Sequence, residues 1–165
     1  MFKRIALLSL ILLAFKGCTK DDICPPDTAT TSNLVITFND NANPDLRKMV
    51  NVLTVKTNNI DSVEVVIPTS TDSIVLPLNT NLDITEYLLI RTVISETDTV
   101  INTDKIKFTY NRENGYVNRA CGFKTEFTNL TTILEDEGSQ NWIKGVVPKR
   151  ETVNDENSAD LTLLH

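Results

Sequence analysis

Histidine is almost absent from this sequence, and its scarcity excludes several kinds of chemistry. The only histidine among the 165 residues is His165, which rules out a histidine-cluster metal site and most catalysis with a histidine base. Glycine is also scarce, with five residues, and no Gly-rich phosphate loop is present. Neither Gly-x-Ser-x-Gly nor Ser-x-x-Lys occurs, so the common signatures of an activated serine are missing. We therefore expect a protein that is not an enzyme and that has no cofactor and no metal.

Basic residues are also fewer than acidic residues. The chain has 16 Lys and Arg against 22 Asp and Glu, for a net charge of −6 and a pI of about 4.8. Surfaces that bind nucleic acid or anionic lipid need clustered cations. We expect no nucleic-acid partner.

Long hydrophobic runs are missing except at the N-terminus, where residues 5–15 are apolar apart from Ser9. Lys3 and Arg4 come before this run. It is too short to span a bilayer, which takes about 20 apolar residues. A core helix would carry polar positions every third or fourth residue, and the run does not. The pattern predicts a secretory signal peptide over residues 1–17.

Cys18 stands where this signal peptide should be cleaved. The segment Phe15-Lys16-Gly17-Cys18 resembles the lipobox of a bacterial lipoprotein signal: Gly17 and Cys18 match the pattern, whereas Phe15 and Lys16 depart from it. The resemblance implies that Cys18 becomes the N-terminus and is acylated, which anchors the chain in a membrane. The alternative is an ordinary signal peptide with Cys18 near its end.

A short charged segment follows Cys18. Lys20-Asp21-Asp22 resembles the export signal of Bacteroidota lipoproteins, which implies an outer-membrane lipoprotein on the cell surface. A solvated charged linker explains these three residues equally well.

The three cysteines make an odd number, and acylation of Cys18 would leave Cys24 and Cys121. Exported proteins occupy an oxidising compartment, so we expect these two to form a structural disulfide. A redox-active thiol is the alternative, but it usually needs Cys-x-x-Cys or a nearby histidine, and the sequence has neither.

Stretches rich in Val, Ile and Thr alternate with turn residues from Asn33 onward. Pro68 and Pro77 are expected to end two strands, and Asn114-Gly115 predicts a hairpin turn across which Tyr110 and Tyr116 could meet. The expected strands are 34–38, 50–56, 62–67, 73–76, 86–94, 99–101, 105–110, 116–127, 129–134 and 142–147. Short strands at this spacing predict an all-β fold, an antiparallel β-sandwich that is immunoglobulin-like or similar.

The chain is therefore expected to have four parts. Residues 1–17 are the signal peptide, and 18–32 are the lipidated cysteine and a flexible tether. Residues 33–147 form the β-sandwich domain. Residues 148–165 form a polar C-terminal tail or an edge strand.

Asp followed by Ser or Thr and an apolar residue occurs four times. The pattern resembles the O-glycosylation sequon of Bacteroidota exported proteins, which makes Thr28, Ser62, Ser73 and Thr99 candidate sites. Asp-Ser and Asp-Thr also start strands after turns, so a structural role is the alternative.

Other candidate sites have simpler explanations. Residues 39–45 space oxygens like a calcium loop, but Pro44 and Val50 occupy the positions of the required Gly and Glu, so we expect a turn without metal. The acids at 135–137 are expected to form a solvated turn. Trp142, Tyr87, Tyr110 and Tyr116 could bind sugar or peptide if exposed, but each also fits a strand face in the core.

Three segments together resemble a family of small uncharacterised Bacteroidota lipoproteins: residues 18–25, the strand 34–38 with Asn43-Pro44 after it, and Arg119-Ala120-Cys121-Gly122-Phe123. The resemblance implies location and fold only. We expect a non-catalytic cell-envelope lipoprotein, a partner-binding or structural module that touches the membrane through its lipid anchor and binds an envelope protein. The alternative is a glycan- or peptide-binding surface lipoprotein, accessory to an uptake system.

Overall fold

The computed structural model describes residues 23–28 and 30–165, so the expected signal peptide and Cys18 lie outside the described residues. The chain divides into two compact units. The described residues of the smaller unit are 23–28, 30 and 116–124, and the larger unit holds residues 31–115 and 125–165.

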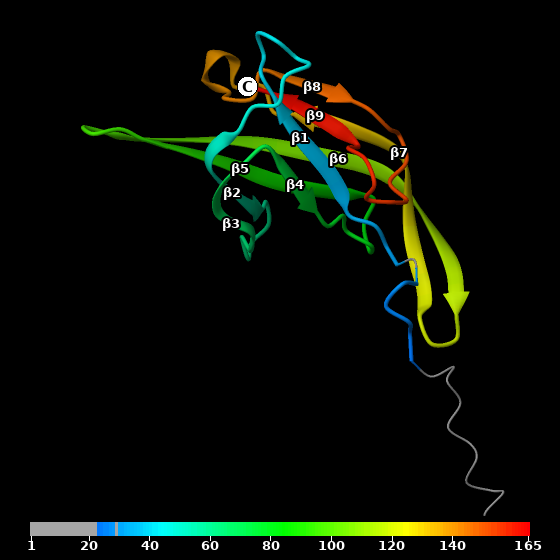
Figure 1. Ribbon diagram of the computed structural model, residues 1–165. Helices are drawn as coiled ribbons and strands as arrows, with labels where there is room; N and C mark the ends of the chain where they lie inside the picture. Colours follow the sequence, from blue (N-terminus) through cyan, green and yellow to red (C-terminus); the bar gives the residue numbers. More distant parts are fainter. Residues whose placement is uncertain (1–22, 29) are drawn as a thin grey trace, which may run out of the picture. The chain divides into compact units, whose positions relative to one another are not determined.

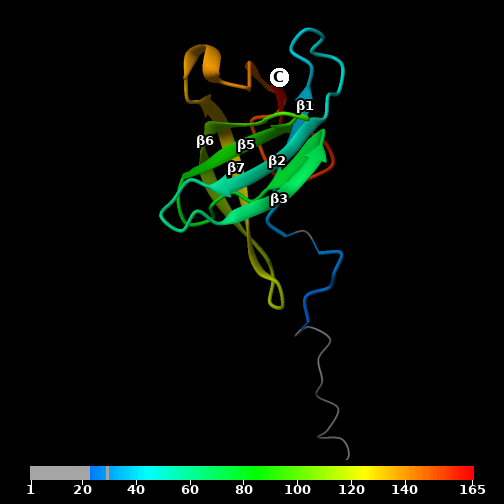
Figure 2. The same cartoon turned by 90° about the vertical axis from the view of Figure 1, so that its left-hand side faces the viewer.

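The described residues form nine strands, which confirms the expected all-β class (Figures 1 and 2). One sheet has the order β4-β1-β9-β8, and the other has the order β3-β2-β5-β6-β7. The strands are β1 Leu34–Asn39, β2 Val50–Thr57, β3 Glu64–Thr71, β4 Ser73–Leu76, β5 Ile84–Ile94, β6 Thr99–Asn118, β7 Gly122–Leu134, β8 Gly145–Pro148 and β9 Leu161–Leu164. A 3-10 turn, η2, covers Gly138–Gln140. No helix among the described residues is long and apolar enough to cross a membrane.

The two sheets enclose one shared core in the larger unit. Along β4, β6 and most of β1, alternate residues point inward, as the two-residue period of a strand requires. The buried residues include Leu34, Ile36 and Phe38 of β1, Leu53 and Val55 of β2, Tyr87 and Leu89 of β5, Ile106 and Phe108 of β6, Phe127 of β7, and Leu161 and Leu163 of β9. Burial of this apolar surface from both sheets is what makes the fold a sandwich.

The smaller sheet is mixed rather than purely antiparallel. β1 pairs with β4 in antiparallel register, Ile36 opposite Ile74, but it pairs with β9 in parallel register, Ile36 opposite Leu161. The hydroxyls of Thr37 and Thr162 lie 2.8 Å apart across the parallel pair. Parallel neighbours need a long connection between them, and here almost the whole chain separates β1 from β9.

The expectation of a polar tail or an edge strand over residues 148–165 is wrong. β9 lies inside its sheet, between β1 and β8. The segment before it is held by Asp160, whose carboxylate is fully buried, accepts a hydrogen bond from the Val35 amide at 2.8 Å and pairs with Arg150 at 2.7 Å. The polar sequence of residues 149–160 does not reveal this role, because Val35, which Asp160 binds, lies 125 residues away along the chain.

Two predicted strand ends, at Pro68 and at Asn114-Gly115, are wrong. Pro68 does not end β3, which continues to Thr71; β3 is an edge strand, where a residue without an N–H is tolerated. Asn114-Gly115 is not a turn, since β6 runs through it to Asn118. The chain instead reverses between Asn118 and Gly122, where the Asn118 side chain accepts a hydrogen bond from the Cys121 amide at 2.8 Å and Gly122 has a φ of 72°.

Candidate functional site

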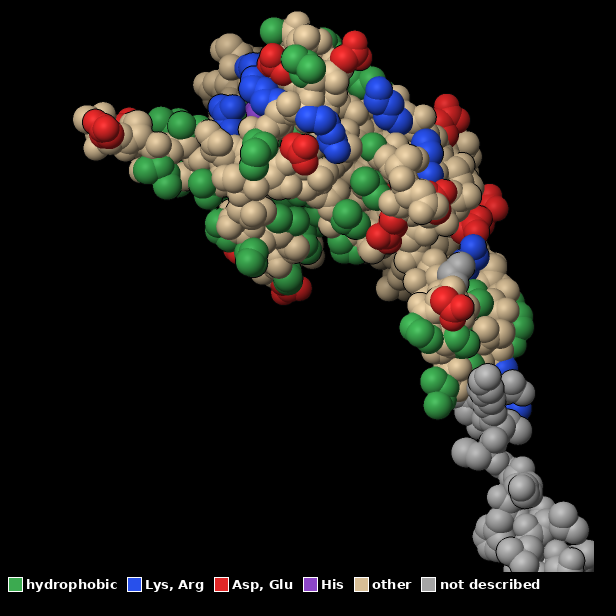
Figure 3. All heavy atoms as spheres, viewed as in Figure 1, with side chains coloured by type: hydrophobic (Ala, Val, Ile, Leu, Met, Phe, Trp, Pro, Cys, Tyr) green, Lys and Arg blue, Asp and Glu red, His purple; other side chains and the backbone are tan. Residues whose placement is uncertain are grey.

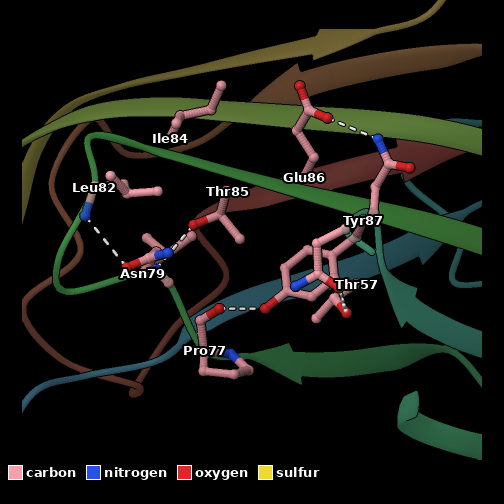
Figure 4. A pocket seen from close by; sticks show the side chains of 11 residues that line it. Thr57, Pro77, Asn79, Leu82, Ile84, Thr85, Glu86 and Tyr87 are labelled. Atoms are coloured by element: carbon pink, nitrogen blue, oxygen red, sulfur yellow. Dashed lines mark hydrogen bonds between the residues drawn. The ribbon is translucent and has the colours of Figure 1, made fainter. Parts of the chain in front are cut away.

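A cavity of about 440 Å³ opens beside the first half of β5 in the larger unit (Figure 4). It is lined by β5, by the end of β2 and by the loop that follows β4. Pro77 and Leu82 supply apolar wall, and Thr57, Thr85 and Glu86 supply polar groups. Its size suits a small ligand, so the chemistry of its lining decides what it can do.

The polar groups of this cavity are already engaged with one another. The Tyr87 hydroxyl donates to the Pro77 carbonyl. The Thr85 hydroxyl lies 2.6 Å from the Tyr110 hydroxyl and accepts from the Asn79 amide. Burial raises the pKa of Tyr87 to about 12 and raises the pKa of Tyr110, so both phenols stay protonated at neutral pH.

Glu86 is the one carboxylate among the described residues that line this cavity. Its carboxylate accepts a hydrogen bond from the side-chain amide of Asn58 at 2.7 Å, and its other oxygen lies 3.8 Å from the Lys107 ammonium. Glycoside hydrolysis requires two carboxylates that face each other across the substrate. The lining residues therefore do not form that pair, nor do they join a nucleophile to a base.

A broader hollow of about 730 Å³ lies over the outer face of β1 and β9. Its two arginines pair with acids or bind backbone carbonyls. Arg150 pairs with Asp155 at 3.0 Å and with Asp160 at 2.7 Å, and Arg47 donates to the Asp72 carbonyl at 2.8 Å. The arginines therefore serve the fold at this surface.

The predicted disulfide is present. Cys24 and Cys121 are bonded across a sequence separation of 97 residues, and both belong to the smaller unit. The bond ties the start of the described chain to the turn between β6 and β7. Cys18, the predicted lipidation site, lies outside the described residues.

The four candidate glycosylation residues do not come together. Ser62 and Thr99 are exposed, and Thr28 and Ser73 are partly buried. Asp98 accepts a hydrogen bond from the Thr99 amide at 2.8 Å, which is the local bonding expected at a turn before a strand. Glycosylation of these residues stays a prediction.

The loop at residues 39–45 is a turn held by its own side chains. The Asn39 amide donates to the Pro44 carbonyl at 2.6 Å, and Asp40 pairs with Lys48 at 2.9 Å. In the part of the chain that the structure describes, no group of three His, Cys, Asp or Glu residues could hold a metal ion.

Of the four aromatic candidates, Trp142, Tyr87 and Tyr110 are buried and only Tyr116 is exposed. Tyr110 packs against Phe127 with ring centroids 4.9 Å apart, so its expected contact with Tyr116 is wrong. Tyr116 instead packs against Phe123 at 5.4 Å. The displaced turn explains the difference, because it changes which residues of β7 lie opposite β6.

Two exposed features escaped the sequence reasoning. One is the Tyr116–Phe123 pair. The other is the end of the β5–β6 hairpin, residues 92–101, which we call the arm; it carries the exposed apolar residues Val93, Ile94, Val100 and Ile101. The sequence predicted strands at both places, in the arm from its β-branched residues, but it could not say that no second sheet covers them.

One family model matches the chain, over residues 52–165, and its description is Family of unknown function (DUF6452). The chain belongs to this family, which confirms the expected membership in a family without an assigned activity. A search of curated proteins and a search of solved structures each found no match. The bacterial lipoprotein part of the expectation stays a prediction.

Proposed function

We propose that this member of the DUF6452 family is a non-catalytic lipoprotein of the cell envelope, anchored in the outer membrane through Cys18, that presents its β-sandwich to a protein partner. The observation that carries the proposal is the Cys24–Cys121 disulfide. Structural disulfides persist in oxidising compartments and are rare in the cytosol. Cys24 also lies only six residues after Cys18, so the covalent link fixes the fold close to the proposed anchor.

The arm supports the partner-binding part of the proposal. β5 and β6 pair out to Ile94 and Thr99, whereas β2 pairs with β5 only as far as Arg91. The arm therefore extends beyond the sheet as a two-stranded ribbon, with hydrophobic side chains along it and acidic groups at its end (Figures 1 and 3). Val93 and Val100 lie opposite each other on one face of the ribbon, and Ile94 and Ile101 lie on the other face. Exposed apolar side chains grouped in this way are typical of interaction sites.

The charge of the arm indicates what kind of partner fits it. Glu96 and Asp98 lie at its turn, and no Lys or Arg occurs between Thr92 and Asp104. A complementary surface would offer an apolar groove with Lys or Arg at one end. Such a partner would bury the four exposed β-branched side chains and neutralise the two acids.

The glycan-binding alternative has less support. Sugar rings stack on flat aromatic faces, and the only aromatic pair exposed among the described residues is Tyr116 with Phe123. These rings meet edge to face at 69°, so the edge of one ring covers part of the face of the other. The pair therefore offers no broad platform to a sugar.

The anchor is tested by metabolic labelling with palmitate. We expect label on the wild-type protein and complete loss of label in Cys18→Ala, because acylation requires that thiol. Retention of label in Cys18→Ala would contradict the proposed anchor.

The partner site is tested by affinity capture from envelope extracts with paired variants. Val100→Ser with Ile101→Ser removes apolar surface from the arm, and Val63→Ser with Ile67→Ser removes a matched exposed pair elsewhere. We expect the arm variant to bind the captured partner about tenfold more weakly, a loss of about 1.4 kcal/mol, while the control binds like wild type. Equal capture by both variants would contradict the role of the arm.

A further inference from the structure

Three large apolar side chains are exposed together in the smaller unit, and we call them the apolar tip. Ile23 is 77% exposed, Tyr116 is 63% exposed and Phe123 is 71% exposed. The two rings are in edge-to-face contact at 5.4 Å. Ile23 directly precedes Cys24, and Phe123 lies two residues after Cys121, so the disulfide holds both ends of the tip in the same unit.

The position of the tip along the chain limits how far it can lie from the proposed anchor. Cys24 is the sixth residue after Cys18, and a fully extended chain spans at most about 20–22 Å over six residues. The headgroup layer of a bilayer is itself several ångströms thick on each side of the hydrocarbon. A chain acylated at Cys18 therefore keeps the apolar tip within reach of the lipid surface.

We propose that the apolar tip inserts into the headgroup region of the membrane and forms a second attachment beside the acyl chains. This inference rests on the proposed acylation of Cys18. Tyrosine is enriched at this depth, where its ring is buried and its hydroxyl is hydrated. Ile23 and Phe123 add apolar surface that is otherwise left in water, and burial of such surface drives interfacial binding.

The described charged residues of the smaller unit are Asp27, Arg119 and Lys124, which together carry one net positive charge. Arg119 lies in the turn between β6 and β7 and is exposed, so its guanidinium can reach lipid phosphate. The chain as a whole is acidic, which disfavours general attraction to anionic lipid. The tip therefore binds through apolar burial, and zwitterionic phosphatidylcholine is sufficient as its ligand.

Hydroxyl-radical footprinting tests the inference on the acylated chain in phosphatidylcholine vesicles. Among the described tyrosines, Tyr87 and Tyr110 are buried and Tyr116 is exposed, so the oxidation of Tyr116 reports on the tip. The reference sample is the unacylated Cys18→Ser chain, free in solution. On vesicles, we expect Tyr116 and Phe123 of the acylated chain to oxidise about tenfold more slowly than in this reference, because inserted side chains would be exposed to water about a tenth of the time. Met49, exposed in the larger unit, should oxidise at the same rate in both samples.

A second measurement separates the tip from the anchor. In the Cys18→Ser background, without acyl chains, Tyr116→Ser with Phe123→Ser should lower sedimentation with vesicles about tenfold. Val63→Ser with Ile67→Ser, a matched exposed pair in the larger unit, should leave sedimentation unchanged.

The outcomes distinguish this inference from the proposed function. Unchanged oxidation of Tyr116 on vesicles whose protein is acylated would overturn the insertion of the tip and leave the anchor standing. Protection of Tyr116 that requires added envelope proteins would overturn it too and would assign the tip to a protein partner. Failure of palmitate labelling alone would refute the anchor, while the sedimentation of the unacylated chain would still decide whether the tip binds lipid.

Discussion

Replacing Cys24 and Cys121 together with serine is expected to lower the free energy of unfolding by about 2–4 kcal/mol. The bond closes a loop over a separation of 97 residues, so its loss gives the unfolded chain much more freedom. The full entropic value for so long a loop is about 4.7 kcal/mol. Part of it is offset because residues 23–30 also gain freedom in the folded state once they are released from the turn. Urea denaturation followed by far-UV circular dichroism measures the loss.

Two controls isolate the effect of the bond. Wild-type protein under a reducing agent should lose the same stability as the double variant, and Cys18→Ser should lose none. Intact mass under non-reducing conditions should show two hydrogens fewer than the fully reduced chain. An unchanged denaturation midpoint in the double variant would mean that the smaller unit opens without cost to the larger one.

The pairing of these cysteines could be deduced from the sequence because counting alone constrains it. With Cys18 assigned to acylation, Cys24 and Cys121 are the two thiols that remain. The strand at residues 105–110 could also be placed, since Ile106, Phe108 and Tyr110 alternate with polar residues and are buried as that alternation requires. The first inference depends on counting cysteines and the second on a local pattern, and the structure confirms the disulfide and the strand.

The inferences that failed required knowledge of distant partners. Asn114-Gly115 is a strong local turn signal, but the pairing of β6 with its neighbours carries the strand straight through it. Residues 161–164 form a short segment that could fray as an isolated sequence. Their burial follows from pairing with β1 on one side and β8 on the other, and no local signal reports that.

The candidate sites show the same limit. Exposed Val and Ile in the arm look like core residues in sequence, because the pattern of a strand is the same whether or not a second sheet covers it. For Asp104, in contrast, the sequence contains a pattern that predicts its buried role. It continues the inward-facing row of Ile106 and Phe108 toward the start of β6, and an acidic residue in such a row predicts a buried hydrogen-bond acceptor.

Asp104→Ala is expected to lower the free energy of unfolding by about 3–5 kcal/mol. The Asp104 side chain is fully buried and accepts hydrogen bonds from the backbone amides of Trp142 and Ile143, at 3.2 and 2.8 Å. Alanine leaves both buried N–H groups without a partner. It also loosens Trp142, whose indole N–H donates to the Leu89 carbonyl at 3.0 Å and whose ring packs against Phe38 in the core.

The fluorescence of Trp142, the only tryptophan in the chain, reports this change directly. Asp104→Asn should lose less stability than the alanine variant, because the asparagine keeps one acceptor oxygen for one of the two N–H groups. It should still be less stable than wild type, since its NH₂ group would face the other N–H donor. Asp61→Ala, at an exposed aspartate between β2 and β3, should change stability by no more than about 0.5 kcal/mol. The two amides belong to Trp142 itself and to its neighbour Ile143. Loss of their hydrogen bonds to residue 104 should therefore expose the indole to water and shift the Trp142 emission to longer wavelength, even before global unfolding. If Asp104→Ala were as stable as wild type, water would have to satisfy the Trp142 and Ile143 amides in place of the carboxylate. The attachment of this segment to β6 would then not depend on the Asp104 side chain.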